Sequence, residues 1–274
     1  MKNVNIGIIQ MRVVEDKLEN IKRAGEFIKI VAEKGADIVV LPEMFNCPYK
    51  TDNFPIYAET AGGYSYTALS QFARSNSIYL VGGSIPEIDM GKVYNTSYVF
   101  DRKGNKIGKH RKMHLFDIDI QGGQCFKESE TLSPGRELNV FDTEFGKFGL
   151  AICYDFRFPE VGRILVQKGA QAIIVPAAFN MTTGPAHWEI MFRSRALDNQ
   201  VYTIGVAPAR DESACYTSYG NSIVVSPWGN VVDRMDEKEG YIITKIDMDY
   251  VEKIRQELPL LNHIKKDIYS LQLI

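Results

Sequence analysis

Short apolar segments alternate with helix-periodic segments along most of this chain, and this alternation restricts the fold more than any other feature. Residues 38–41 are apolar at every position, which is typical of a strand buried on both faces, and Pro42 ends its pairing. Apolar side chains recur at helical spacing in residues 18–31, before Gly35 stops the helix. A strand that needs cover on both faces, preceded by an amphipathic helix, predicts a layered α/β fold.

Both halves of the chain follow this plan. In the first half we expect strands at residues 4–11, 37–43 and 78–85 and a helix around residues 69–73. We also expect a hairpin over residues 94–108 that turns at Lys103-Gly104-Asn105. In the second half we expect strands at residues 145–153, 171–178, 201–208, 220–227, 230–235 and 241–247, with helices near 160–168 and 186–199. Hairpins imply antiparallel pairs, so the sheets should be mixed.

No linker, low-complexity segment or domain boundary is visible, so residues 1–274 are expected to form a single domain. Residues 109–137 lack clean periodicity, and a loop of that length inside a compact domain is usually functional. This loop carries Lys112 and Glu128. The tail from about residue 250 is more charged, and it is expected either to dock on a neighbouring element or to fray.

Composition excludes several classes of function. Hydrophobic residues make up 45% of the 274 positions, enough for a full core, yet no stretch approaches the roughly 18 apolar residues of a membrane span. The N-terminal apolar run is too short for a secretion signal, so we expect a cytoplasmic protein with reduced cysteines. The net charge is −2 and no basic cluster is larger than a pair, which favours a small-molecule substrate over nucleic acid.

Cys153 raises the first question about chemistry, because a free cysteine is more often a buried core residue than a nucleophile. It ends an apolar run and is followed at once by the charged turn of residues 154–157. That arrangement resembles a nucleophile held on a sharp strand-to-helix turn. There the partial positive charge of the helix N-terminus would favour the thiolate.

A cysteine nucleophile also needs a base. His187 lies in a helix-like stretch where a cap or core role is the simpler interpretation, and His110 and His114 have the spacing of helical metal ligands without a helix or an acidic partner. Glu43 is the alternative base, since it follows a buried strand just as Cys153 does, although a solvated loop acid would look the same. Lys112 reads equally well as one charge in a basic loop.

Three motifs taken together indicate a family. LPEMFNCPY contains Glu43, HRKMHLFD contains Lys112 and CYDFRFPE contains Cys153. In this order they resemble the Glu-Lys-Cys triad of the nitrilase (carbon-nitrogen hydrolase) superfamily. Three further stretches are similar to its omega-amidase branch: GQCFKESETLSPG (123–135), NMTTGPAHWEIMFRSRALDNQVY (180–202) and SPWGNVV (226–232).

The resemblance implies a four-layer α-β-β-α sandwich with two mixed β-sheets, formed by a single carbon-nitrogen hydrolase domain over residues 1–274. It also implies a homodimer formed through helices, with no metal and no cofactor. Glu43 would be the general base, and Lys112 with the backbone N–H of Tyr154 would hold the oxyanion. Glu128 matches a second glutamate of the family that orients the lysine or the substrate, although alone it reads as a surface acid.

Substrate preference is inferred from Arg157, whose guanidinium would bind a carboxylate at two points, although a surface ion pair with Asp155 or Glu160 fits the residue equally well. Omega-amidases hydrolyse the terminal amide of 2-oxoglutaramate and 2-oxosuccinamate to the acid and ammonia through a thioester. By resemblance, Tyr49, Phe179 and Thr183 line the same pocket, with Tyr49 and Thr183 at the carboxylate or keto end. Core packing, a helix cap or a turn would explain these three as well.

Other functions remain open at this point. A deaminated-glutathione amidase or an N-carbamoyl amino acid hydrolase would use the same triad. A catalytically silent scaffold of the same fold is the non-enzymatic alternative, and the presence of all three triad residues speaks against it. If Cys153 is a nucleophile, we expect it to be alkylated before Cys47, Cys125 and Cys215 at neutral pH.

Overall fold

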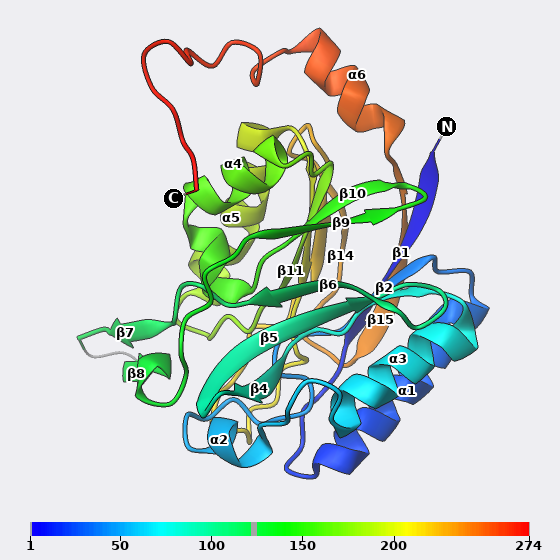
Figure 1. Ribbon diagram of the computed structural model, residues 1–274, viewed down its shortest axis with the longest axis vertical. Helices are drawn as coiled ribbons and strands as arrows, with labels where there is room; N and C mark the ends of the chain where they lie inside the picture. Colours follow the sequence, from blue (N-terminus) through cyan, green and yellow to red (C-terminus); the bar gives the residue numbers. More distant parts are fainter. Residues whose placement is uncertain (1, 122–124, 274) are drawn as a thin grey trace.

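Two β-sheets lie face to face at the centre of the computed structural model, which describes residues 2–121 and 125–273 (Figure 1). The first sheet has the order β15-β1-β2-β3-β5-β4, and β6 pairs with β5. Its strands are β1 (Asn3–Gln10), β2 (Ile38–Val40), β3 (Tyr79–Val81), β4 (Ile85–Asp89), β5 (Lys92–Phe100), β6 (Lys106–Arg111) and β15 (Gly240–Asp247). The pairs β1–β2 and β2–β3 are parallel, whereas β15, β4, β5 and β6 pair antiparallel, so the sheet is mixed.

The second sheet has the order β14-β13-β12-β11-β10-β9. Its strands are β9 (Asn139–Thr143), β10 (Gly146–Leu150), β11 (Ala172–Pro176), β12 (Tyr202–Val206), β13 (Ile223–Val225) and β14 (Val231–Arg234). Here β10, β11 and β12 are parallel and the outer strands are antiparallel. A separate small hairpin is formed by β7 (Asp117–Asp119) and β8 (Cys125–Lys127).

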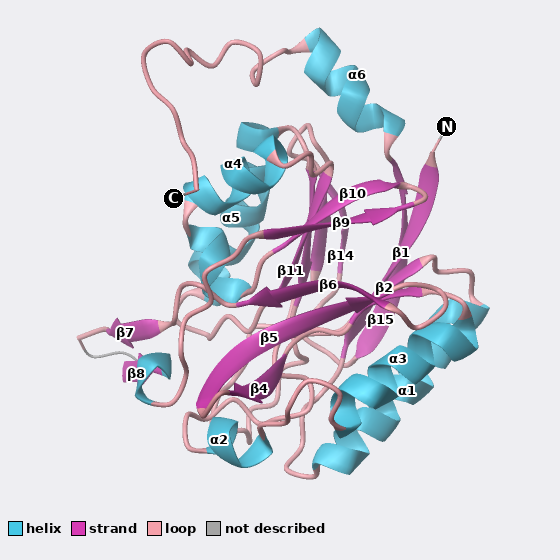
Figure 2. Ribbon diagram, viewed as in Figure 1, coloured by secondary structure: helices cyan, strands magenta, loops and turns pink. Residues whose placement is uncertain are grey.

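Helices cover the outer face of each sheet (Figure 2). The helices of the described residues are α1 (Lys17–Glu33), α2 (Asn53–Tyr57), α3 (Tyr64–Asn76), α4 (Pro159–Gln167), α5 (Gly184–Asn199) and α6 (Asp249–Glu257), with 3-10 turns η1 (Glu128–Glu130) and η2 (Cys153–Arg157). The pair α1 and α3 packs on the first sheet, and α4 and α5 pack on the second. The predicted four-layer α-β-β-α sandwich with two mixed sheets is therefore confirmed.

Continuous apolar runs form the central strands because each strand is covered twice. In β2, Ile38 and Val40 belong to the core between the two sheets, whereas Val39 belongs to the core beneath α1 and α3. Close packing of α1 also requires Gly7 in β1, since an added Cβ there would lie 2.3 Å from a methyl of Val31.

The charged tail docks on the rest of the molecule. Its first part forms α6, which buries Val251 and Ile254, and the chain then returns across α4 and α5, where Leu261 and Leu271 pack against the core of the second half (Figure 1). Other side chains of this tail, Ile268 and Tyr269 among them, are exposed. Among the described residues, no helix combines the length and apolarity needed to cross a bilayer.

Candidate active site

Three reactive side chains reach one buried site from three strand ends. Glu43 follows β2 and Lys112 follows β6, both in the first sheet, whereas Cys153 follows β10 in the second. Glu43 and Lys112 are fully buried, and Cys153 is 4% exposed. The convergence of strand ends predicted for Glu43 and Cys153 is therefore present in the structure, and the site lies where the two sheets meet.

The Lys112 ammonium is held by oxygen acceptors. Its Nζ lies 2.8 Å from Glu128 Oε1, 3.0 Å from Glu43 Oε1 and 3.3 Å from the Tyr49 hydroxyl. Burial alone would lower the pKa of Lys112, but the charges of Glu128 and Glu43 outweigh it and raise that pKa above its ordinary value. Lys112 is therefore a permanent cation, and its longest contact, to Tyr49, is the easiest to exchange for another acceptor.

The two oxygens of Glu43 differ in their partners. Oε1 accepts hydrogen bonds from Asn95 Nδ2 at 2.8 Å, from Lys112 and from the Tyr49 hydroxyl at 3.1 Å. Oε2 accepts one, from the Ala178 N–H at 2.7 Å. Asn95, Lys112 and the Ala178 N–H donate to this carboxylate, whereas the single Tyr49 proton is shared with Glu128, and Oε2 keeps a lone pair that can receive a proton.

Glu128 is fully buried, so its alternative interpretation as a surface acid is wrong. It lies in η1, where Oε1 accepts from Lys112 and Tyr49, and Oε2 accepts from the Phe116 N–H at 2.7 Å. Burial raises the pKa of Glu128, and the charge of Glu43 raises it further, although Lys112 opposes both. The expected proximity of Glu128 to the lysine is thus observed.

Cys153 occupies a sharp turn, with φ at +46° in the left-handed region that non-glycine residues rarely adopt. Burial raises the pKa of the Cys153 thiol well above its ordinary value, and the Glu43 charge adds to this, while Lys112 lowers it. The prediction that a helix N-terminus would favour the thiolate is wrong. Two carboxylates outnumber one ammonium around the sulfur, so the resting group is the thiol.

His110 and His114 are not paired for metal binding, because the ring of each hydrogen-bonds to the buried carboxylate of Asp155. Within residues 2–121 and 125–273, no group of three or more histidine, cysteine or acidic side chains could hold a metal ion. His187 is exposed, so the core interpretation of this residue is wrong; its Nδ1 lies 3.1 Å from an Nη of Arg157.

Arg157 makes no ion pair with any described residue, so the surface pairs considered with Asp155 and Glu160 are absent. Its guanidinium lies over the ring of Phe179, 4.7 Å from the centroid, and 5.7 Å from that of Tyr154. Both rings hold the cation without neutralising it.

Thr183 is 8% exposed and lies at the N-cap position of α5, where its hydroxyl donates to Asn180 Oδ1 at 3.0 Å. Tyr49 differs from its expected place. Its hydroxyl lies among Glu43, Lys112 and Glu128 rather than at a separate carboxylate end of the pocket.

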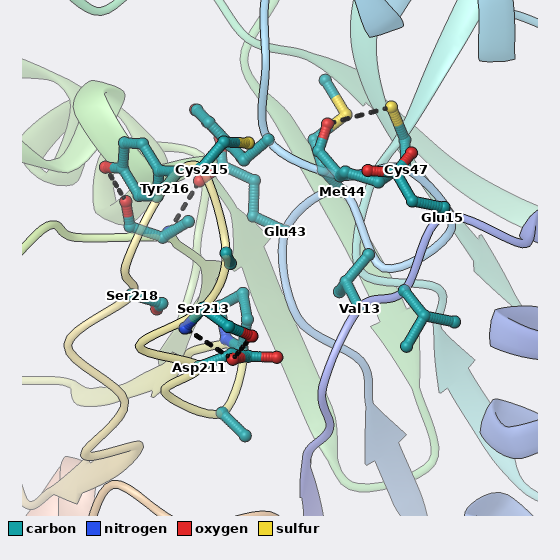
Figure 3. A pocket seen from close by; sticks show the side chains of 17 residues that line it. Val13, Glu15, Glu43, Met44, Cys47, Asp211, Ser213, Cys215, Tyr216 and Ser218 are labelled. Carbon is teal, nitrogen blue, oxygen red and sulfur yellow. Dashed lines mark hydrogen bonds between the residues drawn. The ribbon is translucent and has the colours of Figure 1, made fainter.

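A pocket of about 290 Å³ leads to Glu43 and Tyr49. Figure 3 shows the loop after β12, which carries Asp211, Cys215 and Tyr216, facing the loops after β1 and β2 across this space. The Tyr216 hydroxyl donates to the carbonyl of Ala178, the residue whose N–H binds Glu43. The backbone of Ala178 therefore links Tyr216 in the pocket wall to Glu43.

The comparisons with known proteins agree with this geometry. Residues 5–256 match the carbon-nitrogen hydrolase family. The chain belongs to the carbon-nitrogen hydrolase family. Over 272 residues it is 50% identical to omega-amidase NIT2-A of Xenopus laevis, covering 99% of each chain, and over 273 residues it is 47% identical to omega-amidase NIT2 of Homo sapiens, covering 100% of this chain and 99% of that one.

Among solved structures, the fold is similar to that of Saccharomyces cerevisiae Nit3, a member of branch 10 of the nitrilase superfamily. The TM-score is 0.89 at 43% identity, with 96% of this chain and 97% of that chain covered. The resemblance to the nitrilase superfamily and its omega-amidase branch is therefore confirmed. Of the motif at 123–135, Gly123 and Gln124 lie outside the described residues.

Two buried residues of this carbon-nitrogen hydrolase site were not predicted from the sequence. Asn95 donates to Glu43 through its side chain and accepts the Lys112 N–H at 2.9 Å through its carbonyl, so it holds the acid and the lysine together. Asp155 was considered only as a partner of Arg157. The available signals were that Asn95 lies in the expected hairpin of residues 94–108 and that Asp155 lies two residues after Cys153.

Proposed function

We propose that this carbon-nitrogen hydrolase is an omega-amidase that releases ammonia from the terminal amide of 2-oxoglutaramate and 2-oxosuccinamate. The observation that carries the proposal is the closed cluster of Cys153, Glu43, Lys112 and Glu128 beside an arginine, Arg157, with no ion pair among the described residues. The cluster supplies amide hydrolysis, and the unpaired guanidinium supplies a binding site for the acid end of the substrate.

The first half-reaction forms a thioester. Glu43 takes the proton of the Cys153 thiol as sulfur bonds to the amide carbon, because the raised pKa of that thiol makes attack by a free thiolate unfavourable. The carbonyl electron pair moves to oxygen, where Lys112 and the Tyr154 N–H hold it. Among the described residues that N–H makes no hydrogen bond, which leaves it available.

Loss of ammonia completes the first half-reaction: Glu43 gives its proton to the departing nitrogen, the carbon–nitrogen bond breaks and the acyl group stays on sulfur. The second half-reaction, hydrolysis of this thioester, restores the enzyme. Glu43 then takes a proton from water as the hydroxide adds to the thioester carbon. Collapse of that intermediate breaks the carbon–sulfur bond, and Cys153 regains its proton from Glu43. Side chains and one backbone N–H perform every step, so the proposed cycle uses no metal or cofactor.

The proposal is tested by measuring ammonia release from 2-oxoglutaramate, 2-oxosuccinamate, deaminated glutathione, an N-carbamoyl amino acid and a plain aliphatic amide. We expect the highest kcat/KM for the two short oxo-acid amides. Preference for deaminated glutathione or the carbamoyl compound would contradict the omega-amidase assignment while retaining the cluster. Absence of turnover on all five would contradict the enzymatic proposal and favour a silent scaffold.

Arg157→Ala is expected to raise KM for the oxo-acid amides, with a loss in kcat/KM of about 100-fold, because a charge-assisted carboxylate contact is removed. Turnover of a plain aliphatic amide should change by less than about threefold. Steady-state kinetics on the two substrates check this result. An equal loss on both would contradict a carboxylate-binding role and indicate that Arg157 supports the turn around Cys153.

We also propose that the protein is a homodimer that pairs through the outer face of α5. Ile190 is 64% exposed, and Trp228 is 49% exposed in the turn before β14. This turn packs against Leu197 of α5, where the Arg193 Nε also binds the Gly229 carbonyl, so the turn that carries Trp228 adjoins the face of α5 that carries Ile190 and Leu197.

Ile190→Glu is expected to convert the dimer to monomers of 31.0 kDa, because a buried unpaired charge in the interface is strongly unfavourable. Light scattering coupled to gel filtration measures the mass. The matched control is Ile56→Glu, since Ile56 is 75% exposed on α2, away from this patch. Dissociation by both variants, or by neither, would contradict the proposed interface.

We further propose a cytoplasmic location. The described structure contains four free cysteines, two of them exposed, which suits a compartment that keeps thiols reduced. Cell fractionation with thiol labelling of Cys125 and Cys215 tests this proposal. Recovery in a secreted or membrane fraction would contradict it.

A further inference from the structure

The Asp155 carboxylate is fully buried and accepts hydrogen bonds from five donors. Oδ1 accepts from the Met113 N–H at 3.0 Å, the His114 N–H at 2.8 Å and the His114 Nδ1 at 2.9 Å. Oδ2 accepts from the His110 Nε2 at 2.8 Å and the Ile152 N–H at 3.2 Å. None of these five donors belongs to the reactive cluster of Cys153, Glu43, Lys112 and Glu128.

These five bonds flank both reactive residues. Lys112 lies between two segments that bind Asp155, with His110 before it and Met113 after it. Cys153 likewise lies between Ile152, which donates to Asp155, and Asp155 itself two positions later. A single carboxylate therefore joins the loop that carries the lysine, from the first sheet, to the turn that carries the nucleophile, from the second.

The His110 ring links this junction to a third segment. Its Nδ1 lies 3.2 Å from the Glu137 carbonyl oxygen, and its Nε2 faces Asp155. Both partners are acceptors, so both bonds form only when the ring carries two N–H groups. Burial would raise the pKa of Asp155, but hydrogen bonds from His110 and His114 outweigh it and hold that pKa well below its usual range.

We propose that Asp155 is a positioning residue for the hydrolytic reaction, fixing Lys112 relative to Cys153 through the paired bonds to His110 and His114. It touches no reacting atom and acts through the two segments that it joins. The inference rests on the proposed function for its kinetic readout. The oxyanion donor and the nucleophile must approach one carbonyl group together, and a displacement of about 1 Å can reduce rate about 100-fold.

The first test is Asp155→Asn. An amide places an NH₂ group opposite a backbone N–H in either orientation, that of Ile152 or those of Met113 and His114, so at least one of the five bonds becomes a donor-to-donor contact. We expect kcat to fall about 100-fold while KM changes less than about threefold, because Arg157 and the pocket are untouched. A kcat within about threefold of wild type would overturn the proposal.

A matched control separates positioning from loss of stability. Asp37→Asn removes another carboxylate that joins two segments. Asp37 accepts hydrogen bonds from the Asn5 N–H at 3.0 Å and from the Arg102 guanidinium at 3.1 Å. Asp37 precedes β2, at the opposite end of this strand from Glu43. We expect Asp37→Asn to lower the melting temperature but to leave kcat near wild type. An equal kcat loss in both variants would overturn the specific role of Asp155.

A second pair of variants decides the question if Asp155→Asn does not fold. The His114 side chain is 30% exposed, and its ring stacks on Phe158 at 3.8 Å. His114→Phe keeps the stack and removes the donor, whereas His114→Asn loses the stack and keeps an N–H near the position of Nδ1. We expect kcat to fall about 10-fold in His114→Phe and to stay within about threefold of wild type in His114→Asn. The reverse order would overturn the proposal.

A readout without amide turnover separates this inference from the proposed function. The rate at which iodoacetamide alkylates Cys153, followed by mass spectrometry of its peptide, reports the placement of the thiol beside Glu43 and Lys112. We expect Asp155→Asn to change this rate severalfold and Asp37→Asn to leave it unchanged. If wild type hydrolyses none of the five amides but this difference persists, the proposed function fails and the positioning role stands.

Discussion

Cys153→Ala is expected to abolish ammonia release, with a loss on the order of a millionfold, because no other described thiol lies beside Glu43 and Lys112. Alanine is smaller than cysteine, so it fits the buried turn, and the left-handed backbone at φ +46° is kept by the surrounding contacts. The fold should survive, which circular dichroism checks beside the kinetic assay. Cys125→Ala is the control, since Cys125 is exposed on β8, and its activity should match wild type.

Residual activity near wild type in Cys153→Ala would remove this residue from the mechanism.

The structure changes the expected order of thiol labelling, in which Cys153 was to be alkylated first. Cys153 is buried with a raised pKa, whereas Cys125 and Cys215 are exposed, so a bulky alkylating reagent should modify the two exposed cysteines first.

Glu43→Gln is expected to reduce kcat by between about 10³- and 10⁴-fold, because one carboxylate moves the proton in both half-reactions. The same variant should lower the pKa of Cys153. Burial raises that pKa and is unchanged, but the Glu43 charge also raises it and is removed. A variant with more thiolate and less turnover would show that Glu43 acts as a proton acceptor.

The measurement is the pH dependence of Cys153 alkylation compared with that of kcat. In Glu43→Gln the alkylation profile should move to lower pH while kcat stays low at every pH. Glu87→Gln is the control, since Glu87 is a buried carboxylate that binds Lys109 and Arg111 and contacts none of the reactive residues. Recovery of kcat in Glu43→Gln as the thiol ionises would contradict the general-base role.

The central strands could be predicted from the sequence because a strand that is buried on both faces needs an unbroken run of apolar residues. Residues 38–41 are apolar throughout because neighbouring side chains enter different cores, and the hairpin turn at Gly104 follows from local backbone chemistry. The helix α6 was less visible, since only Val251 and Ile254 are buried in a segment that is otherwise charged.

The supporting residues of the site could not be predicted in the same way. Asn95 and Asp155 act through side-chain hydrogen bonds between segments that are distant in sequence, and such bonds leave no periodic pattern. The direction in which the pKa of Cys153 is shifted could not be predicted from the sequence either. It depends on how many carboxylates and ammonium groups share one closed space, and the helix-terminus argument counted only one local contribution.

The division of the site between two sheets has a consequence for folding. Glu43 and Lys112 extend from the first sheet and Cys153 from the second, and the apolar core between the sheets holds them in register. A partly folded chain in which only one sheet has formed contains either the acid and the cation or the nucleophile, never the whole set. During refolding, the return of ammonia release therefore times the docking of the two halves, whereas far-ultraviolet dichroism also records the earlier formation of each half.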